Sequence, residues 1–399
     1  MSCGYIAGHF YFRHHKLYNM FSYWERQHFF TYDCIIAGAG ITGLSAAIEL
    51  KELFPHFRIV VLERGFLPSG ASTKNAGFAC MGSVSELMDD LQTISKEEVC
   101  RLFEMRKKGL EILRRRLGDE NIGYSANGSY ELISFGDEYL KDKIGAFNEM
   151  LRPIVGSDAF AVADDKLDDF GFSKKAVRGL IQNLCEGEID SGKMMRSLAD
   201  MAMQLGIEIK TGTLVSAFSE MENEVRVCVE DPFSKEEIVL KAGSFIICTN
   251  AFTKQLLPGE ELTPGRGQVL ITRPVKNLKI KGIFHFDKGY YYFREINGRI
   301  LFGGGRNIDF KTEATTEFGI NEAINEDLEQ KLKEVICPGE AIEIDQRWSG
   351  IMAFGKVKFP VIKAVTPHVY MAGRMGGMGV ALASEAARQL AALVYQRCE

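Results

Sequence analysis

Short apolar runs and helical stripes alternate near the start of the chain. Residues 33–37 form an apolar run that predicts a buried strand. The spacing of Leu44, Ala47 and Ile48 then predicts a helix, and a second apolar run at 58–62 predicts the next strand. This order is typical of a βαβ unit.

Different patterns follow further along the chain. Residues 83–117 carry apolar side chains at helical spacing and predict one long helix. Residues 224–229 and 237–241 alternate in the manner of a hairpin. The segment 267–305 is dense in strands, with the hairpin signal Asn-Gly at 297–298. We therefore expect an antiparallel sheet in addition to the βαβ unit, with no internal repeat.

Composition excludes several classes of protein. Of the 399 residues, 46 % are hydrophobic and 25 % are charged, as in ordinary globular proteins of one or two domains. The formal net charge of −5 argues against nucleic acid as the main partner, because phosphate binding needs a basic surface. Since no apolar run approaches the roughly 18 residues of a membrane-spanning helix, we expect no membrane span.

Nine cysteines are present, without a C-x-x-C pair. Their spacing shows none of the clustering of a zinc site or a disulfide framework. Several lie in apolar runs, where a free cysteine behaves as a small hydrophobic residue. We therefore expect no metal site and a reduced, cytoplasmic protein.

The first 19 residues are aromatic and basic, and they lack the apolar run and cleavage site of a signal peptide. We expect the natural protein to start at Met20, with residues 1–31 forming an N-terminal extension.

The hexapeptide GAGITG at residues 38–43 joins the first predicted strand to the helix with the spacing G-x-G-x-x-G. Gly38 allows a tight turn, Gly40 lets the backbone approach a pyrophosphate, and Gly43 lets the helix pack closely on the strand. The helix N-terminus then offers free amides to phosphates. Glu63, at the end of the second strand, is placed to accept hydrogen bonds from a ribose diol. This set predicts a dinucleotide site, and a purely connecting glycine turn is the alternative.

The segment 64–77 is rich in glycine, serine and threonine. A nicotinamide enzyme would continue directly into another helix and strand. A loop of small residues can instead lie against a second phosphate and the ribityl chain of a flavin. An ordinary flexible loop is the alternative interpretation.

The order of GAGITG, LER at 62–64 and GASTKNAG at 70–77 resembles the D-amino-acid oxidase family of FAD-dependent oxidoreductases, which includes glycine oxidase, sarcosine oxidase and gamma-glutamylputrescine oxidase. The resemblance extends to the far end of the chain. A strand at 368–371 runs there into a glycine-rich turn at 372–381, and in this family such a turn and helix lie under the flavin ring. Matches at both ends imply that the chain binds FAD.

The resemblance implies an α/β fold (α+β overall), in which a Rossmann-like FAD-binding domain is interleaved with an antiparallel-sheet substrate domain. The FAD-binding domain is expected to comprise residues 32–118, 176–265 and 345–399. Residues 119–175 and 266–344 are expected to form the substrate-binding domain.

Site residues are also implied by the resemblance. The backbone at Val215 is expected to contact the adenine, and Thr249 and Asn250 resemble a turn that the family places near the cofactor. The histidine and cysteine that attach the flavin covalently in some relatives have no counterpart near residues 74–75 or 354, so FAD is expected to be non-covalent. The amides at the terminal turn would stabilise negative charge on reduced flavin. The residues expected to bind FAD are Gly38, Gly40, Ile41, Thr42, Gly43, Glu63, Arg64, Ser72, Thr73, Asn75, Ala76, Gly77, Val215, Thr249, Asn250, Gly376, Gly377, Met378, Gly379 and Val380.

In this family a neutral amine transfers a hydride to the flavin, and the resulting imine is hydrolysed. By family position Tyr291 is expected to face the flavin, and Arg306 is expected to reach an anionic substrate. A packing tyrosine and an exposed arginine are the alternatives. Relatives that oxidise simple α-amino acids carry an arginine where this chain has Met352 or Ala353. The resemblance therefore favours a small amine without an adjacent carboxylate.

The electron acceptor stays open between O2 and another acceptor. Sarcosine oxidases carry a lysine that helps oxygen react, whereas the corresponding strand here offers Leu301 or Phe302. One alternative is a dehydrogenase that passes electrons to a quinone or a protein carrier. The other is a flavin-binding subunit without chemistry of its own. The sequence does not indicate an oligomeric state.

Overall fold

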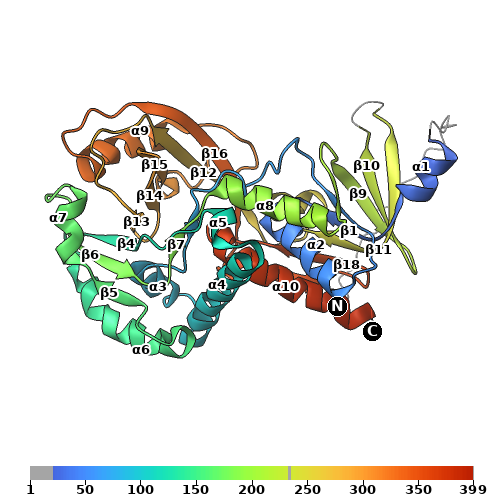
Figure 1. Ribbon diagram of the computed structural model, residues 1–399, viewed down its shortest axis with the longest axis horizontal. Helices are drawn as coiled ribbons and strands as arrows, with labels where there is room; N and C mark the ends of the chain where they lie inside the picture. The colour runs from blue at the N-terminus through green and yellow to red at the C-terminus, as the bar shows by residue number, and fades with distance from the viewer. Residues whose placement is uncertain (1–20, 232–234, 399) are drawn as a thin grey trace.

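Two eight-stranded sheets form the two halves of an elongated molecule, which is seen in the computed structural model in Figure 1. The structure describes residues 21–231 and 235–398. The expected start at Met20 therefore lies outside the described residues. Of the predicted extension 1–31, the structure describes the short helix α1 (Tyr23–His28) and the beginning of the first strand.

The first sheet is built on parallel strands. β1 (Thr31–Ala37) lies between β2 (Ile59–Leu62) and β11 (Glu237–Ile247) and pairs in parallel with both. The order β17-β18-β11-β1-β2-β8 confirms the predicted βαβ unit. The helix of that unit is α2 (Ile41–Leu53). The other strands of this sheet are β8 (Glu208–Lys210), β9 (Val215–Glu220), β10 (Val225–Glu230), β17 (Val361–Ala364) and β18 (Val369–Gly373).

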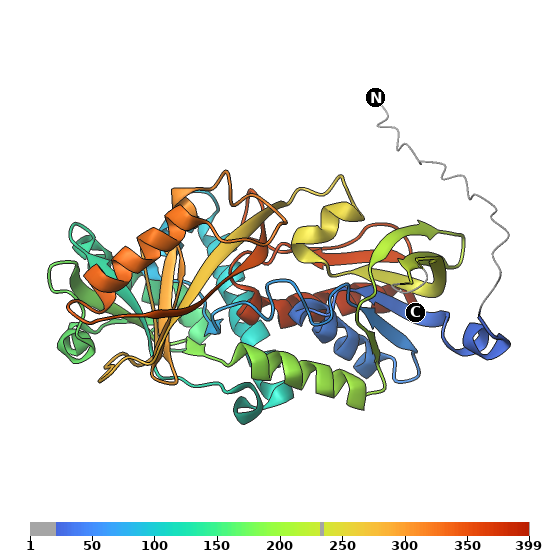
Figure 2. The same cartoon turned by 90° about the horizontal axis from the view of Figure 1, so that it is seen from above.

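The two faces of this sheet are covered in different ways. Ile36 and Val61 face a helical layer. Their neighbours Ile35 and Val60 point to the other side and pack with the three antiparallel strands β9, β10 and β11. Burial on both faces explains why these strands are continuous apolar runs in the sequence. The helical layer lies below the first sheet in Figure 2. It is formed by α2, α4 (Lys96–Leu117), α8 (Ser191–Gln204) and α10 (Gly379–Cys398).

α4 and α10 approach each other very closely at Gly109. A Cβ atom at this position would lie 2.1 Å from the carbonyl oxygen of Ala381 on α10. Because any side chain would force the helices apart, their packing depends on a glycine here. α10 begins at the terminal glycine-rich turn, so this contact also sets the position of that turn.

The second sheet has the order β16-β12-β15-β14-β13-β4-β6-β5 and is antiparallel except for the pair β13–β4. The predicted hairpin at Asn297-Gly298 is confirmed, since Ile296 pairs with Arg299 across it. One face of the sheet packs against α9 (Glu322–Lys331). The strands are β4 (Ser129–Ser134), β5 (Phe160–Val162), β6 (Val177–Asn183), β12 (Thr263–Thr272), β13 (Ile283–Phe286), β14 (Tyr291–Ile296), β15 (Arg299–Gly304) and β16 (Ile344–Phe354).

Two predicted features of the chain differ in the structure. The helix expected over 83–117 is divided into α3 (Val84–Asp90) and α4, because Ser95 and Glu98 form a capping box that starts a new helix. β6 and β16 lie in the second sheet, although their residues were expected in the FAD-binding domain. With these two strands reassigned, the division into two domains remains a proposal. The remaining short elements are α5 (Asp119–Ile122), α6 (Ile144–Val155), α7 (Leu167–Phe170), β3 (Phe78–Ala79) and β7 (Gly187–Glu188).

Within residues 21–231 and 235–398, none of the helices combines the length and the apolar character that crossing a lipid bilayer requires.

Candidate active site

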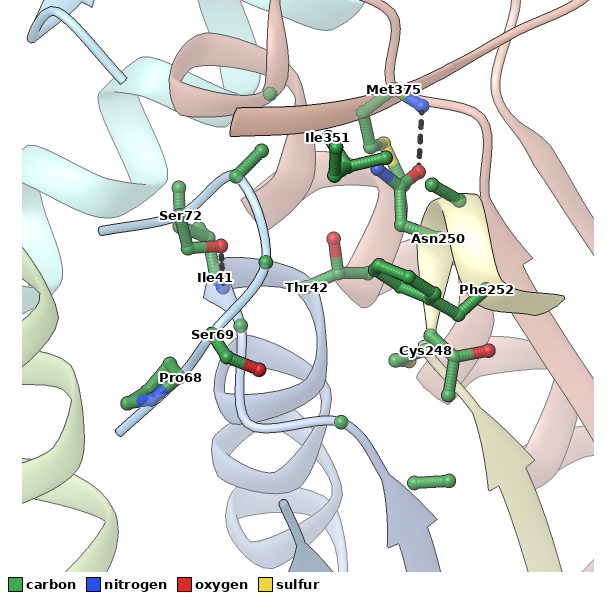
Figure 3. A pocket seen from close by; sticks show the side chains of 18 of the residues that line it. Ile41, Thr42, Pro68, Ser69, Ser72, Cys248, Asn250, Phe252, Ile351 and Met375 are labelled. Carbon is green, nitrogen blue, oxygen red and sulfur yellow. Dashed lines mark hydrogen bonds between the residues drawn. The ribbon is translucent and has the colours of Figure 1, made fainter. Parts of the chain in front are cut away.

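The glycine-rich hexapeptide forms the turn between β1 and α2. Gly38 has a φ of +102°, and a Cβ atom at Gly43 would lie 1.9 Å from the carbonyl oxygen of Gly38. The close contact between strand and helix therefore requires both glycines. At the helix start, the amide of Ile41 donates to Oγ of Ser72 at 3.1 Å (Figure 3). This bond holds the loop 64–77 across the N-terminus of α2.

A cavity of about 160 Å³ opens at the carboxyl ends of β1, β2, β11 and β18. In parallel sheets this edge is where ligands bind. The structure brings together here fifteen of the residues that the sequence predicted at the cofactor. They are Gly38, Gly40, Ile41, Thr42, Glu63, Arg64, Ser72, Asn75, Val215, Thr249, Asn250, Gly376, Gly377, Gly379 and Val380.

Five predicted cofactor residues do not line this cavity, namely Gly43, Thr73, Ala76, Gly77 and Met378. Gly43 packs under the turn, and the hydroxyl of Thr73 donates to a carbonyl of its own loop. Gly77 lies against the backbone of Ile189 and the guanidinium of Arg294. Ala76 and Met378 line a second cavity instead.

Glu63 is buried at the end of β2 with its carboxylate fixed by protein donors. Oε2 accepts the amide of Ala39 at 3.1 Å, and Oε1 accepts the amide of Gly65 at 2.9 Å. The hydroxyl of Ser69 donates to Oε1 at 3.2 Å. These bonds hold the carboxylate in one orientation at the cavity wall, where it has further acceptor capacity for a ligand hydroxyl.

Several wall residues were not singled out from the sequence, among them Pro68, Ser69, Phe252, Ile351 and Met375 (Figure 3). Pro68 and Ser69 lie in the predicted loop, and Met375 lies in the predicted terminal turn. Phe252 stacks under the guanidinium of Arg64, which lies 3.5 Å from its ring centroid. Burial lowers the pKa of Arg64.

The residues of the first cavity fit an FAD. The amides at the start of α2 suit the pyrophosphate, and Glu63 suits a ribose diol. At the terminal turn, a Cβ atom at Gly376 or Gly377 would meet no heavy atom within 4 Å. The backbone of this turn therefore borders open space that a flat ring can occupy. Oδ1 of Asn250 fixes the turn by accepting the amide of Arg374 at 2.9 Å. It also accepts the amide of Met375 at 3.4 Å (Figure 3).

A second cavity of about 320 Å³ adjoins the first. Both cavities are bordered by Ala71, Asn75, Met352, Met375, Gly376, Gly377 and Val380. A ligand in the second cavity would therefore contact a ring placed at the terminal turn.

One face of the second sheet forms a wall of the second cavity. Residues that lie opposite one another on successive strands share that face. They are His285, Tyr292, Gly303, Val269 and Trp348. His285, Tyr292 and Val269 line the cavity. A Cβ atom at Gly303 would lie 2.6 Å from the ring of Tyr292. The Tyr292 ring therefore lies flat over a glycine, and burial raises the pKa of its hydroxyl to about 12.

Tyr291 points away from both cavities. Its hydroxyl donates to Oδ2 of Asp327 on α9 at 2.8 Å, and its ring stacks on Phe286. Burial and the carboxylate of Asp327 raise the pKa of Tyr291. Because side chains alternate along a strand, its neighbour Tyr292 faces the cavity. We therefore replace Tyr291 by Tyr292 as the tyrosine of this site.

Arg306 lies in the wall of the second cavity, just after β15. Its guanidinium lies 3.9 Å from the ring centroid of Phe354, and burial lowers its pKa. Lys74 lines the same cavity. Among the described residues, neither cation has a carboxylate within ion-pair distance. The cavity thus offers two positive groups to an anionic ligand, with Met352 beside them.

Known proteins resemble the chain in sequence and in fold. A family model described as FAD dependent oxidoreductase (DAO) matches residues 33–393. A probable oxidoreductase, OrdL, of Haemophilus influenzae is 22% identical over 377 residues, which are 90% of this chain and 82% of the relative. Gamma-glutamylputrescine oxidoreductase of Escherichia coli is 23% identical over 390 residues, 91% of this chain and 84% of the relative.

Solved structures share the fold at low sequence identity. Glycine oxidase from Bacillus cereus superimposes with a TM-score of 0.73 and 18% identity, covering 92% of this chain and 96% of the other. L-proline dehydrogenase from P. horikoshii gives a TM-score of 0.72 and 17% identity, covering 92% and 94%. The expected mixed fold, with a parallel and a mainly antiparallel sheet, is confirmed.

Proposed function

Because the family match spans most of its length, the chain belongs to the DAO family of FAD-dependent oxidoreductases, and we propose that it oxidises the C–N bond of a small amine or amino acid. The observation that carries this proposal is the junction of the two cavities at the terminal glycine turn. A substrate in the second cavity would lie against the cofactor in the first. The same proposal follows from relatives whose names describe oxidation of amines and amino acids.

FAD would be held non-covalently by the residues of the first cavity. The start of α2 would bind the pyrophosphate, and Glu63 would accept hydrogen bonds from the adenosine ribose. When bound, FAD supplies the hydride acceptor for the carbon next to the substrate nitrogen, and water hydrolyses the imine that forms. The amides of Gly377 and Gly379 would face the ring at a helix start, where they favour negative charge.

The second cavity supports a substrate with an anionic group remote from the amine. Arg306 and Lys74 would attract that group, and Tyr292 would donate a hydrogen bond to it. By the resemblance, Met352 or Ala353 stands where relatives that act on simple α-amino acids carry an arginine, and both line the second cavity. We therefore favour an amine without an adjacent carboxylate, in line with the expectation from the sequence.

The electron acceptor is O2 or another acceptor. Leu301 packs with Ala76 and Val269, and Phe302 lies in the core under α9, so neither provides an amine for oxygen activation. This arrangement favours the second candidate function, a dehydrogenase that passes electrons to a quinone or a protein carrier. We also propose a cytoplasmic location, because no disulfide joins the cysteines that the structure describes.

Anaerobic mixing of the purified holoprotein with a panel of amines and amino acids tests the proposal. We expect one class of compound to bleach the visible flavin absorbance, and Arg306→Gln to slow this reduction at least tenfold for an anionic substrate. Arg299→Gln, at a half-buried arginine that begins β15 and lines neither cavity, is the control and should react at the wild-type rate. Re-oxidation by air then separates an oxidase from a dehydrogenase. A fully loaded flavoprotein that no compound reduces would favour the non-catalytic subunit instead.

A further inference from the structure

His285 lies on β13, on the face of the second sheet that borders the second cavity. It is opposite Tyr292 on β14 and Glu131 on β4. Only 6 % of the residue is exposed, and it lines the cavity wall. A buried imidazole is costly unless its nitrogens find partners. The surroundings of each nitrogen therefore indicate what this histidine does.

One nitrogen of His285 faces a fixed carboxylate. Nδ1 lies 3.8 Å from Oε2 of Glu86, in the first turn of α3. The same oxygen accepts the amide of Ser83 at 2.9 Å in a capping box. The turn after β13 closes over this carboxylate, since a Cβ atom at Gly289 would lie 2.6 Å from Oε1 of Glu86. Glu86 thus lies at ion-pair distance from one edge of the imidazole.

Neighbouring carboxylates keep this imidazole protonated. Burial alone would lower the pKa of His285, but Glu86, with the charges of Glu186 and Glu131, raises it to about 9. Burial has the opposite effect on Glu86, because it raises the pKa of a carboxyl group. The nearby His285 outweighs burial and lowers the pKa of Glu86 to about 2. At neutral pH, both imidazole nitrogens therefore carry a hydrogen.

The other nitrogen, Nε2, is buried without a hydrogen-bond partner among the described residues. Nε of Arg106 on α4 is also buried without a hydrogen-bond partner among the described residues, and Arg106 lines the same cavity. The guanidinium of Arg106 is otherwise held by the carbonyl oxygen of Met81. Two buried N–H donors without acceptors at one cavity are rare in folded proteins. They indicate an acceptor that arrives with a ligand.

The cations at this end of the cavity are surrounded by carboxylates. Lys288 pairs with Asp89 at 2.9 Å, and Lys358 pairs with Asp90 at 2.5 Å. The charges of Glu86, Glu186 and Glu131 act on the imidazole of His285. This surplus of carboxylates differs from the end at Arg306 and Lys74, where two cations have no carboxylate partner among the described residues. The end at His285 therefore suits a neutral acceptor, such as a carbonyl oxygen, better than a second anion.

We propose that Nε2 of His285 and Nε of Arg106 bind the carbonyl oxygen of a carboxamide on the substrate, away from the C–N bond that is oxidised. The inference rests on the proposed function, because it concerns the substrate of the same site. β13 and β15 are separated by β14, so His285 and its counterpart on β15, Gly303, lie about 10 Å apart across the strands, and Arg306 follows Gly303 by three residues. A substrate with an amide carbonyl and several linking atoms can span this part of the cavity.

The test compares three amines of equal shape that differ only at the distal end: γ-aminobutyramide, γ-aminobutyrate and isohexylamine. Each is titrated anaerobically into the holoprotein, and binding is read from the perturbation of the visible flavin spectrum. Bleaching is recorded separately as oxidation. We expect the wild type to bind the amide about 10- to 100-fold more tightly than isohexylamine.

The variants are His285→Met, which keeps the volume but removes the donor, and His285→Gln, which offers an amide N–H near the position of Nε2. His285→Met should reduce the preference for the amide to within about threefold, and His285→Gln should restore part of it. His56→Met, at an exposed histidine outside both cavities, is the matched control and should keep the wild-type preference. Thermal midpoint and FAD content verify that each variant folds.

Equal preference in the wild type and in His285→Met would overturn the inference, even if flavin is reduced. A wild type that binds the three compounds equally, or binds none of them, would also overturn it. If the preference for the amide is present and depends on His285 while no compound bleaches the flavin, the proposed oxidation fails and the carbonyl site stands.

Discussion

Replacing Tyr291 and Tyr292 separately by phenylalanine tests which tyrosine belongs to the site. Each change removes one hydroxyl and leaves the ring. The hydroxyl of Tyr291 donates to the carboxylate of Asp327 at 2.8 Å, and a hydrogen bond to a charged acceptor contributes about 1.5–3 kcal/mol. Because Asp327 also keeps its ion pair with Lys331, we expect the lower end of that range. Tyr291→Phe should therefore lower the stability by about 1–2 kcal/mol and leave substrate oxidation unchanged.

The opposite result is expected for Tyr292→Phe. Its hydroxyl faces the second cavity, and no hydrogen bond is recorded for it within the part of the chain that the structure describes. Stability should stay within about 0.5 kcal/mol of the wild type. Flavin reduction should slow by about 10- to 100-fold, the cost of one substrate hydrogen bond. Thermal unfolding and anaerobic flavin reduction measure the two effects. The strand orientation would be refuted if Tyr291→Phe reacted slowly at full stability while Tyr292→Phe were merely less stable.

Three further predictions follow from the packing and the charges. Gly109→Ala should destabilise the protein by about 1–3 kcal/mol and weaken FAD retention. The control Gly145→Ala in α6, where a Cβ atom would meet no atom within 4 Å, should stabilise the protein by up to about 1 kcal/mol. Equal thermal midpoints of the two variants would contradict the close packing at Gly109. Glu63→Gln should weaken FAD binding about tenfold in apoprotein titrations by fluorescence quenching, because it removes a charged acceptor. Burial raises the pKa of Glu313, but hydrogen bonds, above all from Arg266, lower it overall. The stabilisation by Glu313 is thus fully present above the unfolded pKa near 4.5 and is lost as the pH falls through the lower folded value. The thermal midpoint of Glu313→Gln should therefore depend less on pH in this acidic range than that of the wild type.

The βαβ unit was predictable from the sequence because its signals are local. Strand, glycine turn and helix follow one another within about two dozen residues, and each glycine has a steric reason. The break near Ser95 was missed for a physical reason too. Apolar residues such as Leu91, Ile94 and Val99 keep a helical spacing across it, so periodicity alone does not reveal the new start. The capping box of Ser95 and Glu98 was the available signal.

Long-range features were less predictable. A strand pattern does not specify its partners, so the sequence did not indicate that β6 and β16 lie in the second sheet. The orientation of β14 was ambiguous because aromatic residues occupy both of its faces, from Tyr290 to Phe293, and leave no polar alternation to mark the exposed side. Only the packing of α9 against one face of the sheet decides that Tyr291 points toward α9 and away from the cavities.

The contribution of β18 and α10 to the first cavity has a consequence for biosynthesis. Gly38 is translated early, whereas the turn at Gly376 and the helix that packs on α2 follow hundreds of residues later. While the chain is being made, the apolar side of α2 has no α10 to cover it, and the parallel sheet lacks a strand beside β11. Cofactor capture is therefore expected after translation of α10, and a nascent chain that stalls before β18 is expected to present exposed apolar surface to chaperones and proteases.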